Sequence, residues 1–343
     1  MRGSICKVAR NRDIRDERSG EGRGFMGQGS RKGELAPERM RKPPALREGD
    51  RIAVVAPSGG VDPSLLAAGI AVLEGRGFRV SPPARREPYR LFSGRDAERR
   101  EELLAAFADP DVRAVWFARG GYGMNRLLPG LEAEWLREHA RICIGFSDAT
   151  AFLQWLVHGA GVTALHGPMV AHDLLREETA GGLEHLLALA AGASDWSVPI
   201  PCGLVPGAVE GPLLGGCLTV IASLAGTPWA PRFAGTIALL EDTHERPQRK
   251  IDRMLIHLRQ SGMLDGVRGI LFGAMPECGP PDEIRATILD CLGDLEVPIG
   301  FGAPVGHGEA HLAVPLGAAV RLEVAAGEAG GDLRGLEPAV EAA

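Results

Sequence analysis

The chain has 343 residues, 45% of them hydrophobic and 24% charged, which is the composition of a globular protein long enough for two domains. No stretch approaches the roughly 18 consecutive apolar residues that span a bilayer. The basic residues at the N-terminus are followed by more charge instead of the apolar core of a secretory signal. We therefore expect a cytoplasmic protein with no membrane partner.

Charge and cysteine usage exclude further classes. Residues 1–42 carry 12 Lys/Arg against 6 Asp/Glu, whereas residues 43–343 carry 26 against 38, so the acidic body would repel nucleic acid. Residues 1–42 are also rich in Arg and Gly without apolar periodicity, and predict a disordered tail. The six cysteines form no C-x-x-C pair, so we expect neither a zinc site nor a disulfide framework.

Residues 43–170 alternate between short apolar runs and helical patterns, which is typical of a parallel sheet with crossover helices. Strands are predicted at residues 51–57, 78–80, 113–118, 142–146 and 163–167, and helices at 63–77, 95–110 and 149–161. The alternation fades after Val170. Residues 171–208 are therefore predicted to connect two domains.

The second half of the chain predicts a smaller β-rich α/β domain over residues 209–330, followed by a flexible C-terminus at 331–343. Its expected strands are 236–241, 269–275, 298–304 and 319–324, with helices at 251–264 and 283–293. The predicted fold class is α/β: an N-terminal, Rossmann-like sandwich with a parallel sheet, and a smaller β-rich α/β C-terminal domain.

Ser147 stands between the strand that ends at Phe146 and a helix that begins beyond Asp148. A serine on a strand-to-helix turn exposes its hydroxyl above the sheet, and the backbone N–H groups that follow can stabilise an oxyanion. The G-x-S-x-G pattern of such turns is not met, because the sequence reads Gly-Phe-Ser-Asp-Ala. The alternative is that Ser147 or Asp148 merely caps the helix.

The loop Arg119–Gly123, with the sequence RGGYG, also follows an apolar strand and should line the same edge of the sheet. Its glycines would let the backbone approach a bound carbonyl or anion closely. A phosphate-binding loop is a competing interpretation, although neither G-x-G-x-x-G nor a P-loop is present. A plain tight turn is the third.

A nucleophilic serine needs a base and an acid that orients the base. His307 lies in a loop-like segment between strands, with His311 as the local rival. Glu241 ends the predicted strand 236–241 and has Asp242 and Glu245 as neighbours, although a charge at a strand end is usually only solvated. No H-E-x-x-H pattern is present, so a metal site is not expected.

Eight blocks, in this order, resemble the LD-carboxypeptidase family, which includes the murein tetrapeptide carboxypeptidases and the microcin C self-immunity proteins. They are APSG (56–59), RGGYG (119–123), GFSD (145–148), HGPM (166–169), GPLLGG (211–216), LAGTPW (224–229), LLED with E-x-P and IDRML (239–255), and GHG (306–308). The resemblance covers about residues 45–325.

The resemblance implies a catalytic triad of Ser147, Glu241 and His307, with an oxyanion hole formed by the backbone N–H groups of Gly121 and Asp148. It implies the fold described above, a homodimer, and no metal or cofactor. The implied reaction cleaves the L,D-peptide bond before a C-terminal D-Ala in small muropeptides. Hydrolysis of peptidyl-nucleotide or aminoacyl conjugates is the close alternative. A non-catalytic module that binds a small ligand is the alternative from another class.

Three departures from the family pattern affect the expected substrate cleft. Cys217 stands where the family has asparagine, Gln248 where it has an aromatic residue, and the segment before Ile251 is one residue longer. The candidates for substrate binding are three residues of the RGGYG loop: Arg119, Gly120 and Tyr122. A surface or interdomain ion pair is the alternative role for Arg119.

Overall fold

The structure is a computed structural model that describes residues 40–176 and 180–341. The tail predicted over residues 1–42 lies, up to residue 39, outside the described residues. Within the described part of the chain, no helix is both long and apolar enough to cross a membrane.

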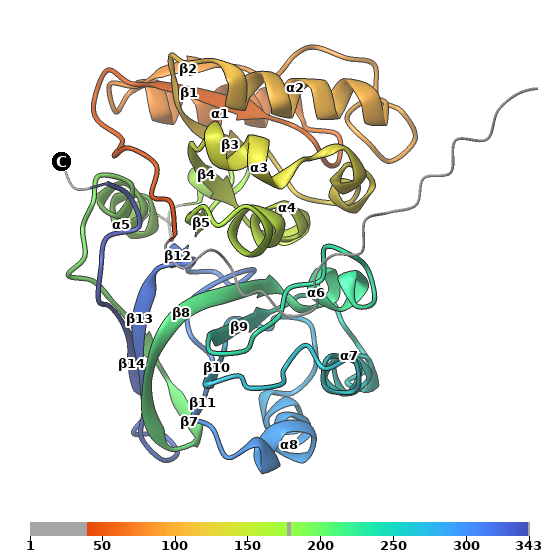
Figure 1. Ribbon diagram of the computed structural model, residues 1–343, viewed down its shortest axis with the longest axis vertical. Coiled ribbons are helices and arrows are strands. Elements are labelled where there is room, and N and C mark those ends of the chain that lie inside the picture. Colours follow the sequence, from red (N-terminus) through yellow and green to blue (C-terminus); the bar gives the residue numbers. More distant parts are fainter. Residues whose placement is uncertain (1–39, 177–179, 342–343) are drawn as a thin grey trace, which may run out of the picture. The chain divides into compact units, whose positions relative to one another are not determined.

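The first sheet has six strands in the order β12-β5-β4-β3-β1-β2 (Figure 1). All neighbours pair in parallel except β12, which runs antiparallel to β5 at the edge. The strands are β1 (Arg51–Val55), β2 (Arg79–Ser81), β3 (Val112–Phe117), β4 (Ile142–Gly145), β5 (Ala164–His166) and β12 (Val314–Leu316). Strands β3 and β4 are buried almost throughout, as expected for a sheet with both faces covered.

The connections of the first sheet are helical, as the alternation predicts. The helices are α1 (Pro63–Glu74), α2 (Asp96–Ala108), α3 (Ala133–Glu138), α4 (Thr150–Gln154) and α5 (Ala180–Ala190). Short turns add η1 (Met124–Arg126), η2 (Leu128–Gly130), η3 (Ser147–Ala149), η4 (Trp155–Gly159) and η5 (Asp173–Leu175). The helix predicted over 149–161 is therefore three pieces: the end of a 3₁₀ turn, a short α-helix and a π-helical turn.

The second sheet has eight strands in the order β6-β14-β13-β8-β9-β10-β11-β7. Its parallel centre, β8 to β11, is continued by antiparallel strands on both sides. The strands are β6 (Ser197–Ile200), β7 (Cys202–Val205), β8 (Gly207–Cys217), β9 (Ile237–Glu241), β10 (Gly269–Phe272), β11 (Ile299–Phe301), β13 (Ala319–Val324) and β14 (Gly331–Gly335).

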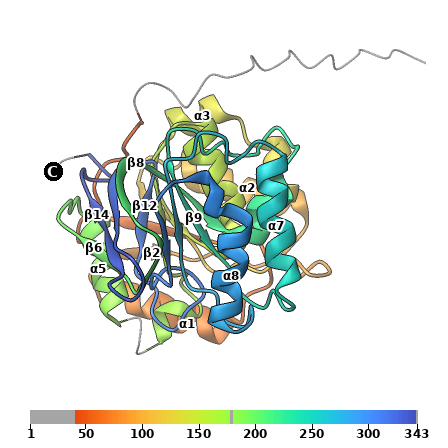
Figure 2. The same cartoon turned by 90° about the horizontal axis from the view of Figure 1, so that it is seen from below.

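Three helices lie on one side of the second sheet: α6 (Leu218–Leu224), α7 (Arg249–Gln260) and α8 (Pro281–Leu292), with the turn η7 (Gly293–Leu295) after them. Figures 1 and 2 show α7 and α8 beside each other on that side, in two views. Buried leucines and isoleucines on both helices join the same apolar core as the sheet.

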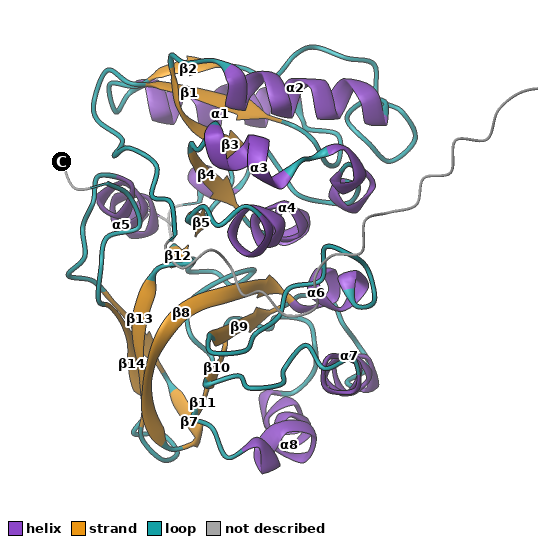
Figure 3. Cartoon of the chain, in the orientation of Figure 1, coloured by secondary structure: helices purple, strands orange, loops and turns teal. Residues whose placement is uncertain are grey.

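The α/β fold class with two sheets is confirmed, and the structure adds detail where the sequence pattern faded. The segment 171–208, predicted as a connection, contributes α5, β6 and β7, and residues 331–335 of the predicted flexible C-terminus form β14. Both segments pack into the structure, because apolar residues such as Val198 and Leu333 are fully buried. Figure 3 shows β12, from the second half of the chain, next to β5 of the first.

Candidate active site

Ser147 lies directly beyond β4, as the first residue of the 3₁₀ turn η3. Its φ angle is 58°, a left-handed conformation that costs energy for any residue with a Cβ and clusters at functional sites. The position before the turn's first residue is Phe146, and no side chain there caps the turn. Within the described residues Ser147 Oγ makes no hydrogen bond, so the hydroxyl is not a helix cap.

The loop Arg119–Gly123 lies against Ser147. A methyl group in place of the Gly120 hydrogen would sit 2.9 Å from both Cβ and Oγ of Ser147, and 3.4 Å from the Asp148 nitrogen. Gly121 has a φ of 101° and is exposed. The glycines are therefore needed for close approach, which favours the site interpretation of this loop over a plain tight turn.

Asp148 fastens this loop to the serine turn. Its buried carboxylate accepts a hydrogen bond of 2.9 Å from the backbone N–H of Met124. Burial raises the pKa of Asp148, against the opposing effects of the nearby Ser58 hydroxyl and the N–H groups of Met124 and Gly123. The side chain of the residue after the serine thus has a local structural role of its own.

Glu241, the last residue of β9, is fully buried and meets His307 from the loop after β11. Nδ1 of His307 lies 2.7 Å from Oε2 of Glu241, and the His307 backbone N–H donates to the same oxygen at 3.2 Å. The glycine before the histidine, Gly306, has a φ of 99° and leaves no room for a Cβ beside that oxygen. Sequence and backbone together bring the carboxylate and the imidazole into contact.

The surroundings of Glu241 and His307 shift the pKa values of both side chains. Burial alone would raise the pKa of Glu241, but the charge of His307, its hydrogen bond and the nearby His166 imidazole outweigh that effect, so the pKa of Glu241 lies well below its usual value. Burial alone would lower the pKa of His307, but the charge and hydrogen bond of Glu241 raise it above its usual value. A carboxylate that stays ionised beside a basic imidazole is the arrangement a general base needs.

Phe146 connects the serine turn with the imidazole. Its ring centroid lies 4.8 Å from that of His307, at an interplanar angle of 58°. The side chain of His307 is 18% exposed, whereas Glu241 behind it has no exposed surface. No hydrogen bond joins Ser147 to His307 among the described residues, a looseness that is common in enzymes without substrate.

The residues that the sequence offered as alternative base or acid have other partners in the structure. His311 is 3% exposed and its Nε2 lies 3.4 Å from Nδ1 of His166, not at the surface beside Ser147. Asp242 accepts hydrogen bonds from the backbone N–H and the hydroxyl of Thr219. Glu245 forms an ion pair of 3.1 Å with Lys250.

The structure also places a residue that sequence reasoning missed as a site candidate. His166, the last residue of β5, has its Nε2 3.7 Å from Oε1 of Glu241. Two signals in the sequence could have found it: His166 is a polar residue that ends an apolar strand, and it opens the family block HGPM (166–169).

Comparisons with known proteins place the chain in a family. Residues 52–167 match the family described as LD-carboxypeptidase N-terminal domain, and residues 210–322 match its partner, the LD-carboxypeptidase C-terminal domain. The chain belongs to the LD-carboxypeptidase family. It is thus a serine-type LD-carboxypeptidase, and the alternative of a non-catalytic binding module is set aside.

Relatives with assigned names support this membership. A Streptomyces coelicolor protein named as a carboxypeptidase is 40% identical over 83% of this chain and 94% of its own length. The murein tetrapeptide carboxypeptidase of Pseudomonas aeruginosa is 35% identical over 80% of this chain and 93% of its own.

Solved structures resemble this LD-carboxypeptidase as well. The muramoyltetrapeptide carboxypeptidase of Oxalobacter formigenes superimposes with a TM-score of 0.75 at 32% identity, covering 82% of this chain and 97% of that one. The microcin C7 self-immunity protein in its wild-type apo state has a TM-score of 0.78 at 19% identity, over 88% and 99% of the two chains, and so shares the fold.

The departures of this LD-carboxypeptidase from the family pattern lie at two places. Cys217 pairs with Glu241 in the parallel register of β8 and β9, and its thiol donates to Oδ1 of Asp242 at 3.7 Å. Burial, then the charges of Asp242 and Glu241, raise the pKa of the Cys217 thiol well above its usual value. The thiol therefore stays protonated.

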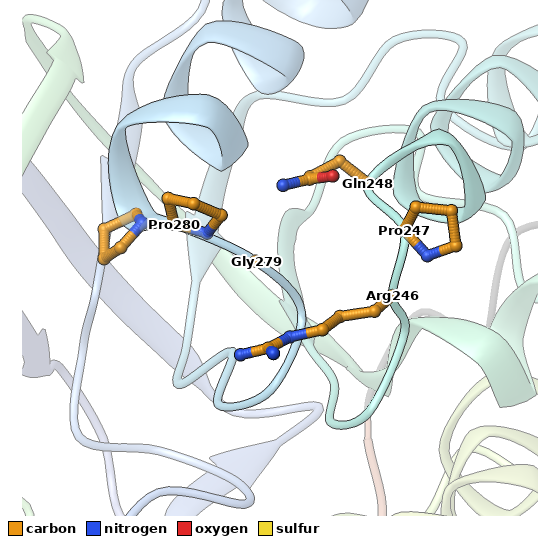
Figure 4. A pocket seen from close by; sticks show the side chains of 6 residues that line it. Arg246, Pro247, Gln248, Gly279 and Pro280 are labelled. Carbon is orange, nitrogen blue, oxygen red and sulfur yellow. The ribbon is translucent and has the colours of Figure 1, made fainter.

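Gln248 lies at the second place, a hollow of about 500 Å³ between the loops that precede α7 and α8 (Figure 4). The hollow is lined by Arg246, Pro247, Gln248, Gly279, Pro280 and Pro281. Gln248 Nε2 donates to the carboxylate of Glu283, which joins the loop before α7 to the first turn of α8. Gln248 therefore holds one side of the hollow in place through a hydrogen bond, whereas an aromatic residue at this position would offer a ring face to a ligand.

The remaining binding candidates are exposed around the RGGYG loop. Arg119 donates through Nη1 to the carbonyl of Gly60, and within the described residues it forms no ion pair. The ring of Tyr122 is 53% exposed and lies 5.7 Å from that of Phe92. Trp196, by contrast, is 8% exposed and packs in the apolar core.

Proposed function

We propose that this LD-carboxypeptidase hydrolyses the L,D-peptide bond before the C-terminal D-Ala of small muropeptides, with Ser147, Glu241 and His307 as its triad. The observation that carries the proposal is the 2.7 Å contact between His307 and Glu241. The ring of Phe146 lies 4.8 Å from that of His307, and the next residue is Ser147, whose φ is 58°. The substrate class is supported by the names of the Pseudomonas and Oxalobacter relatives.

In the proposed reaction, His307 takes the proton of the Ser147 hydroxyl through Nε2 while Oγ attacks the carbonyl carbon before D-Ala. The tetrahedral intermediate collapses as His307 returns that proton to the departing amine, leaving an acyl-enzyme on Ser147. Water, deprotonated by the same imidazole, then releases the shortened peptide. Glu241 stabilises the imidazolium in both halves, and no step uses a metal or cofactor.

The oxyanion is proposed to rest on the backbone N–H groups of Gly121 and Asp148. The close approach of Gly120 to the serine turn supports this role, because a Cβ added at Gly120 would lie only 3.4 Å from the Asp148 nitrogen. Backbone donors are preorganised, so they stabilise the developing charge without reorganisation during the reaction.

Recognition of the substrate is proposed to involve the same loop. Arg119 uses one Nη1 donor for Gly60, and a guanidinium has five N–H donors in all, so others remain for a terminal carboxylate. Gly120 gives the scissile bond access to the serine, and the exposed ring of Tyr122 offers an apolar surface beside it.

The deciding experiment incubates the pure protein with L-Ala-γ-D-Glu-meso-diaminopimelate-D-Ala or with an aminoacyl-adenylate analogue, and identifies products by mass. We expect loss of D-Ala alone, and a Ser147→Ala variant on the order of 10⁶-fold slower. Ser261→Ala, on the far end of α7, is the control and should be unchanged. Turnover of the adenylate analogue alone would assign the substrate to the conjugate class, and full activity of Ser147→Ala would refute the triad.

A homodimer and a cytoplasmic location are proposed as well, on the resemblance to the family. Sedimentation of the pure protein and fractionation of the source cells test them. A monomer at micromolar concentration, or recovery outside the cytoplasm, would contradict the respective proposal.

A further inference from the structure

The carboxylate of Glu241 has two oxygens, and the triad accounts for only one. Oε2 receives both contacts from His307, whereas Oε1 is buried and has no hydrogen-bond partner among the described residues. The same is true of the imidazole nitrogen that faces it, Nε2 of His166, 3.7 Å away. Two buried, unpaired polar atoms that face each other are costly unless they interact.

Next to His166 lies a third buried histidine, His311. Nε2 of His311 lies 3.4 Å from Nδ1 of His166, and both rings are packed edge-on around Phe146, with centroid distances of 4.5 Å and 5.8 Å. The polar side chains therefore form one buried row: His307, Glu241, His166 and His311. His166 and His307 flank the carboxylate from different sheets, because His166 ends β5 of the first sheet and His307 follows β11 of the second.

The chemistry of these groups fixes where the protons lie. A carboxylate can only accept, so His166 must carry its proton on Nε2 for the contact with Oε1 to be favourable. Nδ1 of the neutral ring is then an acceptor, and Nε2 of His311 is the donor that faces it. Burial lowers the pKa of His311 well below its usual value, which keeps that ring neutral.

We propose that His166 is a positioning residue for the reaction: it donates Nε2–H to Oε1 of Glu241, and His311 fixes the required tautomer by donating to Nδ1 of His166. Held at both oxygens, the carboxylate cannot rotate away from His307. This inference rests on the proposed triad and extends it by two residues that are not exposed to substrate.

Other ionisable groups surround the row and are common to all variants below. They are Asp242 and Cys217 of the second sheet and Asp173 and Arg176 of the segment around η5. Because these groups stay in place, a change in the pH profile on replacing His166 reports on the His166 contact itself.

The test compares His166→Leu, which removes the donor, with His166→Gln, whose amide nitrogen reaches the position of Nε2. For His166→Leu we expect kcat/KM to fall roughly 10- to 100-fold, the effect of losing one hydrogen bond to a charged group. The acid limb of the pH profile of kcat/KM should also move to higher pH in this variant. Without its second donor, the Glu241 carboxylate binds the proton of His307 more strongly. His166→Gln should restore the limb and most of the activity.

Two further measurements keep the proposal falsifiable if His166→Leu folds poorly. His311→Phe should shift the acid limb in the same direction as His166→Leu but less, and His139→Leu, a half-buried histidine stacked on Trp135, should leave it unchanged. Imidazole ¹⁵N spectra, with the His166 signals assigned by their absence from His166→Gln, should show a neutral ring protonated at Nε2.

Three results would overturn the inference: an unshifted acid limb with kcat/KM within twofold of wild type in His166→Leu, equal defects in His166→Leu and His166→Gln, or a His166 ring protonated at Nδ1. Failure of the triad itself is distinguishable, since activity would then survive in Ser147→Ala.

Discussion

The carboxylate of Asp148 accepts a hydrogen bond of 2.9 Å from the backbone N–H of Met124, and so anchors the end of the RGGYG loop to the residue that follows Ser147. The serine turn and the loop proposed to complete the oxyanion hole come from different strands, β4 and β3. Their relative position depends on this buried contact. Two different losses, of stability and of alignment, should therefore accompany its removal.

Replacing Asp148 by alanine should lower the free energy of unfolding by about 2–3 kcal/mol, because a buried N–H loses its acceptor. Asp148→Asn keeps one oxygen acceptor and should lose less. Urea unfolding followed by circular dichroism measures the loss of stability. A fall in kcat at saturating substrate measures the loss of alignment between the serine turn and the loop. An alanine variant with wild-type stability and wild-type kcat would contradict this role.

Gly120→Ala should reduce kcat/KM at least about 10²-fold, since the added methyl group displaces the serine turn by a fraction of its own size. The space for that methyl lies 2.9 Å from Ser147 Oγ, so either the loop or the serine must move. Gly181→Ala, in open space on α5, is the matched control. Equal activity of the two variants would mean that the loop does not confine the nucleophile.

Glu241→Gln should lower kcat/KM on the order of 10³- to 10⁴-fold and move the acid limb of the pH profile to lower pH. The negative charge of Glu241 raises the pKa of His307, and His307 acts as a base only when neutral. Removing the charge therefore lets the imidazole lose its proton at lower pH. Initial rates between pH 5 and 9 measure the limb, and an unshifted limb would show that His307 is not the titrating base.

The alternation of strands and helices predicted the first sheet well, because its parallel strands other than β2 are short apolar runs. The strand β8 was not predicted, although it lies near the centre of the second sheet. Its sequence, GAVEGPLLGGC, carries four glycines and a proline, which in a sequence indicate turns and loops. The ladder contacts on both sides supply the stability that its own residues lack.

Some site residues could be predicted from the sequence, whereas others depend on how the two sheets meet. Ser147, Glu241 and His307 could be proposed from the sequence because each stands beside an apolar strand within a family motif. His166 stands at a strand end too, but its relation to Glu241 depends on how β5 of one sheet meets β9 of the other. No local pattern encodes that distance, just as none predicts that β12 joins the first sheet.

The cysteine beside Glu241 gives a final prediction, on reactivity. Burial raises the pKa of Cys278 to about 11 and that of Cys291 to about 12, and it raises the thiol pKa of Cys143 and Cys217 as well. These four side chains are buried, whereas Cys202 is half-buried. Among the described cysteines, native protein at pH 8 should therefore be alkylated by iodoacetamide first at Cys202.

Peptide mapping by mass spectrometry should show Cys217 reacting at least about ten times more slowly than Cys202 in native protein, and at a similar rate in guanidinium. Labelling of native Cys217 as fast as Cys202 would contradict a buried, protonated thiol. Slow labelling would mean that Cys217 is a buried, protonated thiol, in keeping with its hydrogen bond to Asp242. In that case Cys217→Asn, which restores an amide donor there, should change KM for the peptide more than kcat, since the triad is untouched.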